Sequence, residues 1–363
     1  MQYKVIGLMS GSSLDGLDIV YVHFEEISGK WNFEIRETAC IPYSNELREK
    51  LAGATSLSGR DYLLLHTEFG HFLGTSVNEF IEEKGLAYQV QLIASHGHTS
   101  FHIPEKRMTA QLGDGAAIAA VTGIHTITDF RSCDIALGGQ GAPVVPIGEK
   151  LLFPEYDLFL NIGGIANISI PRPEAIGFDI CPANRILNVL AANTERGYDE
   201  DGRLASIGSV RLPLLRDLNQ FAYYRQSYPK SLSNDFGLKE ILPLIENANL
   251  PKQDALRTYV EHIVIQISAS VDLVLKNTLE GPVARKLLVT GGGAHNLFLM
   301  EQLKNNLFAA GIEVVIPGKE LVDYKEALII GLMGALRWRE EENVISSVTG
   351  SKRSSINGAI WSS

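Results

Sequence analysis

The chain has 363 residues with 45% hydrophobic and 20% charged side chains, a composition typical of a globular protein long enough for two domains. Its formal net charge of -10 argues against general binding to nucleic acid or to an anionic membrane surface, because both are negatively charged. An anionic small molecule is still compatible, since one site needs only a local concentration of donors. The three cysteines are widely spaced and odd in number, which indicates reduced thiols in a cytoplasmic protein.

The first predicted elements are a strand, a tight turn and two further strands. Residues 3–9 predict the strand, 10–16 the turn, and 17–24 and 31–42 the returning strands, which are rich in β-branched and aromatic residues. A helix should follow from Ser44, whose side chain is a suitable N-cap.

The first turn combines glycines with hydroxyl residues and one carboxylate. Glycine lets backbone N–H groups approach an anion without a Cβ in the way. In the functional interpretation, Ser12, Ser13 and the backbone amides hold a phosphate while Asp15 holds a hydrated Mg²⁺. In the other interpretation, Asp15 is an Asx-turn residue that satisfies its own backbone. The candidate phosphate ligands of this turn are Gly11, Ser12, Ser13, Leu14, Asp15 and Gly16.

The second half of the chain opens in the same way. Residues 157–162, 167–170 and 175–180 predict strands, 163–166 a glycine turn, and a helix should start at about Ala183. A β-β-β-α-β-α unit that occurs twice is the plan of the actin, hexokinase and heat-shock chaperone ATPase superfamily. The sequence therefore predicts a two-domain α/β fold of the actin-like, ribonuclease H-like type, with the nucleotide in the cleft between the domains.

A third strand, residues 286–290, ends in three consecutive glycines. We expect an N-terminal domain of residues 1–129, to which the tail 347–363 returns. The C-terminal domain should comprise residues 130–346 and carry the second phosphate loop and an adenosine loop. The phosphate-binding candidates in this domain are Asn161, Gly163, Gly164, Gly291, Gly292, Gly293 and Asn296.

Between the halves, residues 129–143 combine charge, glycine and proline without a helical or strand period. One interpretation of this loop is a hinge or linker. A loop that lines a ligand is the other, and it suits the glycines and polar groups better.

Two acidic residues are candidates for catalysis. Asp179 closes a predicted strand and has the position and basicity to take a proton from water or a hydroxyl. Alternatively, Asp179 caps the next helix, although Pro182 and Asn184 could serve there.

Glu326 begins a predicted helix, one face of which carries Ala327, Gly331, Gly334 and Ala335. These small residues would let the helix pack tightly against a sheet or a ligand. A first-turn acid that complements the helix dipole is the other interpretation of Glu326.

Polar residues near a fourth strand suggest a substrate site. The strand at residues 90–95 is followed by a histidine-rich segment that lacks zinc-site spacing, so hydrogen bonds from His96 and Thr99 to a substrate are favoured over a metal. Asp114 and Asp129 lie at loop edges, where sugar-binding carboxylates and solvated surface acids both occur.

Together these segments resemble the anhydro-N-acetylmuramic acid kinases of bacterial cell-wall recycling. The loop at residues 129–143 is the most specific part, because actins and ordinary sugar kinases have nothing like it. The similarity covers nearly the full length and includes residues 7–16, 95–99, 111–114, 129–143, 161–169, 177–179, 229–231, 291–296 and 347–350.

The resemblance implies phosphorylation of the sugar at O6 while water opens the 1,6-anhydro ring, giving N-acetylmuramic acid 6-phosphate and ADP. By the family's pattern, Asp179 deprotonates the water that attacks C1 and Glu326 orients that water. The γ-phosphoryl group of ATP captures the departing O6, and Mg²⁺ and the glycine turns stabilise the phosphate charge. The substrate-binding residues that the resemblance implies are His96, Thr99, Asp114, Asp129 and Arg131.

The chain departs from the family's pattern near Asp179. The usual Asp-Thr-Gly-Pro-Gly-Asn is Asp-Ile-Cys-Pro-Ala-Asn at residues 179–184, and His98 stands where glutamine is usual. Ala183 would clash if its position required a positive φ. These changes bear on the identity of the substrate more than on the reaction class.

Two other functions are compatible with parts of the sequence. One is a kinase for a different sugar, suggested by the changes after Asp179. The other is an actin-like, nucleotide-gated binding or filament protein, against which Asp179 and the loop at 129–143 argue. We expect a cytoplasmic protein whose partners are ATP and an amino sugar, without nucleic acid or membrane. The oligomeric state is open, with a homodimer as one option.

Overall fold

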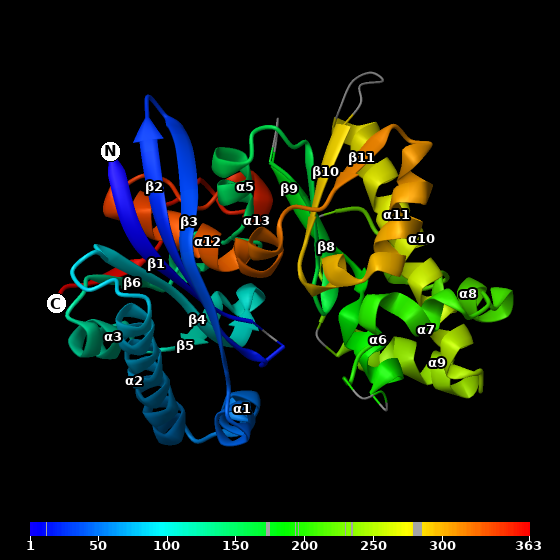
Figure 1. Cartoon of the computed structure of the whole chain (residues 1–363), viewed down its shortest axis with the longest axis horizontal. Helices are drawn as coiled ribbons and strands as arrows, with labels where there is room; N and C mark the ends of the chain where they lie inside the picture. Colours follow the sequence, from blue (N-terminus) through cyan, green and yellow to red (C-terminus); the bar gives the residue numbers. More distant parts are fainter. Residues whose placement is uncertain are drawn as a thin grey trace. The chain divides into compact units, whose positions relative to one another are not determined.

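The computed structural model describes residues 1–363 except residues 12, 172–174, 193, 195, 229, 234 and 279–284, and except the side chains of residues 277 and 278. The chain divides into two compact units. Unit 1 comprises Met1–Pro154 and Tyr324–Ser363, and unit 2 comprises Glu155–Asp323. Each unit is a mixed α/β structure built on a sheet (Figure 1).

The sheet of unit 1 has the strand order β12-β6-β4-β1-β2-β3, and β5 pairs with β4 outside this order. β1 is antiparallel to β2 and parallel to β4, and β12 is antiparallel to β6. The tail of the chain therefore joins this sheet. The strands are β1 (Gln2–Ser10), β2 (Gly16–Ile27), β3 (Lys30–Pro42), β4 (Leu92–Ile103), β5 (Met108–Leu112), β6 (Thr126–Thr128) and β12 (Ala359–Trp361).

Helices pack against this sheet. Ile6, Leu8 and Leu17 point to one face, where they form a buried core with Phe69 and Leu73 of α2. In Figure 1, α2 and α3 run together beneath the sheet. The helices of unit 1 are α1 (Asn45–Ala52), α2 (Gly59–Glu83), α3 (Gly115–Thr122), α4 (Ser132–Ala136), α5 (Pro146–Leu152), α12 (Lys319–Trp338, which begins in unit 2) and α13 (Ser346–Thr349), with the 3₁₀ turns η1 (Ala54–Ser56) and η2 (Pro104–Lys106).

α12 contacts the sheet through its small residues, as the sequence predicts. A Cβ built on Gly7 of β1 would lie 2.1 Å from the carbonyl oxygen of Ala327, so only glycine allows this approach of helix to strand. Likewise, a Cβ on Gly334 would lie 2.6 Å from the Cβ of Ala94 in β4. The small face of α12 is therefore used for packing on the sheet.

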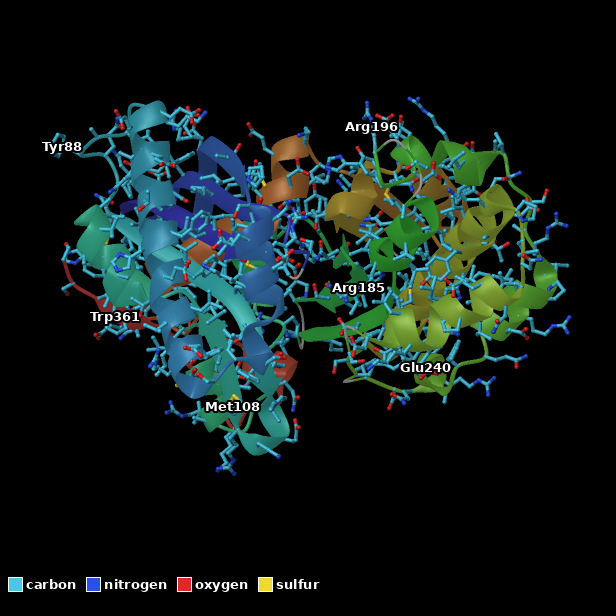
Figure 2. All side chains as sticks on the ribbon, turned by 90° about the horizontal axis from the view of Figure 1, so that it is seen from below. Tyr88, Met108, Arg185, Arg196, Glu240 and Trp361 are labelled. Atoms are coloured by element: carbon cyan, nitrogen blue, oxygen red, sulfur yellow. The ribbon has the colours of Figure 1, made fainter. Side chains whose placement is uncertain are left out.

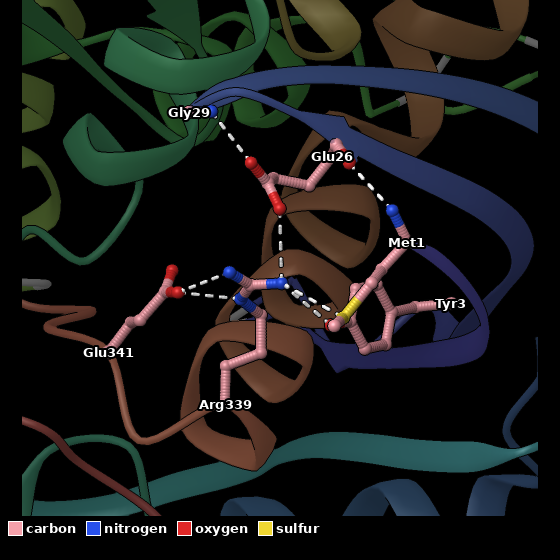
Figure 3. A network of polar contacts seen from close by, with 6 residues as sticks. All are labelled: Met1, Tyr3, Glu26, Gly29, Arg339 and Glu341. Atoms are coloured by element: carbon pink, nitrogen blue, oxygen red, sulfur yellow. Dashed lines mark hydrogen bonds and ion pairs between the residues drawn. The ribbon is translucent and has the colours of Figure 1, made fainter.

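The end of α12 is also tied to the first two strands (Figure 3). Arg339 donates hydrogen bonds to Tyr3 at 2.8 Å and to Glu341 at 2.6 Å, and it forms an ion pair with Glu26 at 3.2 Å. Its guanidinium also lies over the rings of Tyr3 and Trp31. These contacts hold the C-terminal end of α12 on unit 1.

This packing explains why the unit boundaries differ from those expected. The sequence predicts boundaries at 129/130 and 346/347, whereas the chain passes between the units at 154/155 and 323/324. The loop at 129–143 lies within unit 1, so it is not a hinge between the units.

The sheet of unit 2 has the order β11-β10-β7-β8-β9. Its inward side chains form one core with α6, α10 and α11, and Figure 1 shows α10 and α11 running along this sheet. The strands are β7 (Leu158–Ile162), β8 (Ile165–Ile170), β9 (Ile176–Pro182), β10 (Arg285–Thr290) and β11 (Ile312–Val315). The helices are α6 (Asn184–Ala191), α7 (Arg203–Ser206), α8 (Leu212–Leu218), α9 (Leu242–Asn247), α10 (Lys252–Thr278) and α11 (Leu297–Phe308), with the short turns η3 (Glu200–Gly202), η4 (Ala222–Arg225), η5 (Gly237–Ile241) and η6 (Gly292–His295).

α10 is the one described helix that is long and apolar enough to cross a membrane by length and composition. Its most apolar window has a mean hydropathy of 1.2, and 61% of that window is buried inside the protein. Its apolar side chains, including Leu256, Val260 and Ile267, belong to the core of unit 2. This is the behaviour of a core helix.

The two sheets repeat one topology. In unit 1, β1 pairs antiparallel through β2 to β3 and parallel through β4 to β6. In unit 2, β7 pairs antiparallel through β8 to β9 and parallel through β10 to β11. This duplicated order is the actin-like ATPase fold that the sequence predicts.

Several local expectations are corrected. β4 does not end at Ser95 but continues to Ile103, because it pairs there with β5. The loop at 129–143 contains the short helix α4, and residues 196–206 contain η3 and α7. Other expectations are confirmed: Ser44 caps α1 by accepting a hydrogen bond from the N–H of Leu47, and the three cysteines are free thiols.

Candidate functional site

In unit 1, the turn between β1 and β2 holds Asp15 in a defined position. Its Oδ1 accepts hydrogen bonds from Ser13 Oγ at 2.7 Å and from Gly16 N–H at 3.0 Å. Leu14 takes a left-handed conformation with φ of 56°, and its N–H donates to the carbonyl of Gly11 at 3.3 Å. The described residues place no hydrogen-bond partner on Oδ2 of Asp15. Ser12, another candidate in this turn, lies outside the described residues.

Two further candidates of unit 1, His96 and Arg131, contact one another. The Nε of Arg131 donates to His96 Nε2 at 2.9 Å, and its Nη1 donates to the carbonyl of Gly141 at 2.8 Å. The other ring nitrogen of His96 is 2.9 Å from the carbonyl of Gly97. Burial lowers the pKa of Arg131 to about 10, while the charge of Glu326 opposes that shift. The structure therefore brings His96, Arg131 and the loop at 129–143 together.

The other residues of unit 1 that are predicted to bind the sugar form hydrogen bonds within the protein. Asp114 caps α3 by accepting from the N–H of Ala116 at 2.9 Å, and Asp129 accepts from the N–H of Ser132 at 3.2 Å. Thr99 accepts a long hydrogen bond, 3.4 Å, from Gln111. These contacts orient both carboxylates, and they leave the surface and ligand interpretations of each open.

A cavity of about 270 Å³ adjoins these candidates. Its lining includes His96, Asp129 and Gln111 together with Trp361 of the tail. The indole of Trp361 donates to Thr128 at 2.9 Å, and Figure 2 shows this residue at one edge of unit 1. Sequence reasoning missed Trp361, because nothing near it in the chain links the tail to β6.

Glu326 lies in the interior of α12, not in its first turn. The helix begins at Lys319, seven residues before the start that the sequence predicts. The helix-dipole interpretation of Glu326 is therefore wrong. The preceding residue, Lys325, is buried, and its Nζ lies 2.9 Å from Oε1 of the buried Glu149 in α5.

In unit 2, the second and third glycine turns lie side by side, because β7 and β10 are paired up to Asn161 and Thr290. Gly291 has a φ of 82°, and a Cβ on it would lie 2.4 Å from Oδ1 of Asn161 and 2.9 Å from the backbone of Ile162. Only glycine fits there. The candidates Gly292 and Gly293 continue this turn in η6.

The end of each turn meets a helix N-terminus. The carbonyls of Gly163 and Gly164 accept hydrogen bonds from the N–H groups of Asn184 and Ala183 at the start of α6. Asn296 caps α11 by accepting from Leu299 N–H at 2.9 Å. Asn296 thus has a structural role beside its predicted role in nucleotide binding.

Asp179 lies within β9, and its side chain is half-buried. Its Oδ2 accepts from the N–H of Leu232 at 2.9 Å, and its backbone carbonyl accepts from Tyr223 Oη at 2.6 Å. Burial raises the pKa of Asp179 above its usual value, and the hydrogen bond from Leu232 opposes this rise. A carboxyl group of raised pKa has the properties of a general base.

The structure answers two questions about residues 179–184: whether Asp179 caps α6, and whether Ala183 has a positive φ. α6 is preceded by Ala183 without any side-chain cap, so Asp179 is not the cap of that helix. Ala183 has a φ of -126°, so an alanine is accepted here without strain from a positive φ.

The supporting residues Tyr223, Lys230 and Leu232 were not identified as site residues from the sequence. Lys230 lies over the ring of Tyr223 at 4.7 Å and donates to the Tyr223 carbonyl at 3.3 Å, and its own carbonyl accepts from Asp179 N–H at 3.3 Å. Only residues 229–231, noted as a motif, carried a signal. Tyr223 carried none, because its contact with Asp179 spans 44 residues.

The duplicated topology and the glycine turns at its strand ends define a protein of the actin-like ATPase class. The model of the anhydro-N-acetylmuramic acid kinase family matches residues 3–363, and this chain belongs to that family. A kinase of this family on an ATPase fold implies the use of ATP.

Its relatives match over their full length. An anhydro-N-acetylmuramic acid kinase of Vibrio vulnificus (strain CMCP6) is 33% identical over an alignment of 372 positions that covers 98% of each chain. The corresponding protein of Aliivibrio fischeri is 35% identical over 99% of each chain.

Similar solved structures include component A of the (R)-2-hydroxyglutaryl-CoA dehydratase of Acidaminococcus fermentans, with a TM-score of 0.46 at 13% identity over 92% of this chain and 97% of that one. Another is the activator of the 2-hydroxyisocaproyl-CoA dehydratase from Clostridium difficile with bound ADPNP, with a TM-score of 0.45 at 14% identity over 94% of this chain and 96% of that one.

Proposed function

We propose that this protein phosphorylates O6 of 1,6-anhydro-N-acetylmuramic acid with ATP while water opens the anhydro ring, a step of peptidoglycan recycling. Family membership supports the overall reaction. The observation that carries the catalytic assignment is Asp179, a half-buried carboxylate of raised pKa that accepts a hydrogen bond from the Leu232 N–H.

In the proposed reaction, Asp179 takes the proton of the attacking water. The water oxygen bonds to C1, the C1–O6 bond breaks, and the electron pair on O6 attacks the γ-phosphorus of ATP, so that ADP leaves. The phosphoryl group thereby replaces the general acid that an ordinary inverting glycosidase would need. The products are N-acetylmuramic acid 6-phosphate and ADP.

We assign Glu326 to orienting the water. It lies in the middle of a helix that packs on the sheet of unit 1, and its charge acts on the half-buried side chain of Arg131. A rigid helix is a suitable support for a residue that must hold a small reactant in one position.

The phosphate ligands are assigned to the glycine turns. In unit 1 these are Gly11, Ser12, Ser13, Leu14, Asp15 and Gly16, and in unit 2 they are Asn161, Gly163, Gly164, Gly291, Gly292, Gly293 and Asn296. Turns rich in glycine can direct several N–H groups at phosphate oxygens. The convergence of two such turns beside β7 and β10 supports this assignment.

Asp15 fits a hydrated Mg²⁺. One of its oxygens is held by Ser13 and Gly16, and Oδ2 has no hydrogen-bond partner among the described residues. Those residues form no cluster of three metal-ligating side chains, but Mg²⁺ often uses one or two carboxylates and keeps its waters. When bound with ATP, the ion would neutralise charge on the phosphate oxygens.

For the sugar we propose contacts from residues of unit 1: Thr99, Asp114, Asp129 and Arg131, supported by His96. The cavity beside His96 and Asp129 is consistent with this assignment. We also propose a cytoplasmic location, where ATP is supplied. A homodimer, and the absence of nucleic-acid and membrane partners, stay predictions that size-exclusion chromatography and cell fractionation can check.

Incubation with Mg-ATP, the anhydro sugar and ¹⁸O water tests the reaction. Phosphate on O6 together with ¹⁸O at C1 is the expected result. Phosphorylation of another sugar in preference to this one would indicate a different substrate. The departures from the family's pattern at residues 180–183 are the reason to test for one. ATP turnover that needs no sugar and accompanies polymerisation would instead indicate an actin-like filament protein.

A further inference from the structure

Both ring nitrogens of His96 are engaged within unit 1. Nε2 lies 2.9 Å from Nε of Arg131, and Nδ1 lies 2.9 Å from the carbonyl oxygen of Gly97. The Nε of arginine can only donate, so Nε2 of His96 must accept and cannot carry a proton. The proton is therefore on Nδ1, which donates it to Gly97. The ring is the neutral Nδ1–H tautomer.

The surroundings keep this ring neutral. Burial, together with the charge of Arg131, lowers the pKa of His96 to about 3. His96 therefore remains a hydrogen-bond acceptor for Arg131 throughout the pH range in which a cytoplasmic enzyme works.

His96 and Gly141 hold one edge of the Arg131 guanidinium. Nε donates to His96 and Nη1 donates to the carbonyl of Gly141 at 2.8 Å. A guanidinium has five N–H groups in a fixed plane, so two bonds define its orientation. The other three N–H groups have no hydrogen-bond acceptor among the described residues.

The carbonyl of Gly141 is itself fixed. Gly141 N–H donates to Oδ2 of Asp134 at 2.8 Å, and Thr349 of the tail donates to the other oxygen of Asp134 at 2.7 Å. Asp134 is fully buried. The buried carboxylate of Asp134 thus fixes the part of the loop whose carbonyl accepts the hydrogen bond from Arg131.

We propose that His96 is a positioning residue: it accepts a hydrogen bond from Arg131 and so presents the remaining N–H groups of that side chain to the oxygen atoms of the sugar. This inference rests on the proposed function. It replaces the expectation that His96 itself binds the substrate, because neither ring nitrogen is available.

Two substitutions distinguish the contact made by Nε2 of His96 from the contact made by Nδ1. Glutamine can place an acceptor near the position of Nε2, so His96→Gln keeps the bond to Arg131. Asparagine reaches only the position of Nδ1, so His96→Asn keeps the contact with Gly97 and loses that bond. His71→Gln, on the exposed side of α2, is the control.

We expect His96→Asn to raise KM for the anhydro sugar by about 10- to 100-fold, the range for a hydrogen bond to a charged group, with KM for ATP little changed. His96→Gln should stay within about threefold of the wild type, a change of less than one hydrogen bond. Equal loss in both variants, or no loss in His96→Asn, would overturn the proposal. Thermal melting identifies a variant that has lost its fold.

Two measurements separate this proposal from the function on which it rests. In a double-mutant cycle, adding His96→Asn to Arg131→Gln should cost nothing further, and independent effects would contradict the proposal. Nitrogen-15 NMR of labelled histidine should show one ring that keeps the neutral Nδ1–H form down to pH 5 and is missing from His96→Gln. A wild type that binds the sugar without turning it over would refute the proposed function and leave this test intact.

Discussion

At the scale of single residues, the environment of Asp179 decides its chemistry. Burial favours the neutral acid and so raises the pKa, whereas one hydrogen bond from Leu232 stabilises the carboxylate. The partial burial that makes this carboxylate suitable as a general base therefore makes its ionised form unfavourable for the stability of unit 2 at neutral pH.

Replacement of Asp179 by asparagine should lower kcat by about 10²- to 10⁴-fold, the usual contribution of a general base, with little change in ATP binding. Because the variant removes a half-buried charge and asparagine can still accept the hydrogen bond from Leu232, its melting temperature should not fall. Asp272→Asn, on the exposed side of α10, is the control. Full activity in Asp179→Asn would show that another group takes the proton.

The pH dependence of kcat/KM should reveal the same group. Asp179 acts as a base only when ionised, so activity should decline as the pH falls through its pKa, which lies above the usual value for aspartate. The folded-state pKa is raised, so the folded protein binds this proton more tightly than the unfolded chain does. The associated stability is present at low pH and is lost as the pH rises through the raised pKa. A rate profile whose acidic limb sits at an ordinary aspartate pKa would contradict the burial argument.

Asp15→Ala should raise the concentration of Mg-ATP needed for half-maximal turnover, because the turn loses its only carboxylate. The deficit should shrink as Mg²⁺ is raised, and a titration of rate against Mg²⁺ measures it. Glu79→Ala, exposed on α2, removes an acid elsewhere in unit 1 and serves as the comparison. Unchanged turnover at limiting Mg²⁺ would remove Asp15 from the metal site.

At the scale of secondary-structure elements, a buried ion pair joins α5 to α12. Lys325 and Glu149 are 2% and 1% exposed, and their charged atoms are 2.9 Å apart. The chain leaves unit 1 shortly after α5 and re-enters it within α12. The pair therefore joins the two segments that lead into and out of unit 2.

Lys325→Met should destabilise unit 1 by about 3–5 kcal/mol, because it leaves the Glu149 carboxylate buried without its cation. Lys319→Met on the same helix removes a lysine that is 83% exposed, and its effect should stay below about 1 kcal/mol. Urea unfolding followed by circular dichroism compares the two. If both variants unfold at the same urea concentration, the buried pair does not support the packing of α12.

At the scale of the whole molecule, ligand binding should appear as added stability. A non-hydrolysable ATP analogue with Mg²⁺ at 100 times its Kd should stabilise the folded protein by about 2.7 kcal/mol, visible as a higher melting temperature. The Asp15→Ala variant should show a smaller rise at the same concentration. An unchanged melting temperature in the wild type at saturating analogue would argue against nucleotide binding. The nucleotide cleft between the domains stays a prediction from the sequence.

Features that depend on nearby residues could be read from the sequence. The strands around each glycine turn, the Ser44 cap and the duplicated strand order follow from alternation, turn residues and capping, all of which act over a few positions. Asp15, Asp179 and the triple glycine were predicted as site residues for the same reason, since polar residues and glycines close to the end of an apolar strand are a local signal. Their functional roles stay predictions.

Features that depend on long-range packing were decided by the tertiary structure. α12 packs against β1 because Gly7 has no Cβ and so allows the backbone of Ala327 to approach. The two residues are 320 positions apart, and neither segment by itself indicates this contact. Likewise, the contacts of both His96 ring nitrogens, with Arg131 and with Gly97, are visible only in the structure. The sequence determined the repeated fold and indicated which acids to propose for chemistry, because local patterns encode both. Only the tertiary structure decided which of these residues touch, because burial and contact depend on partners far away in the chain.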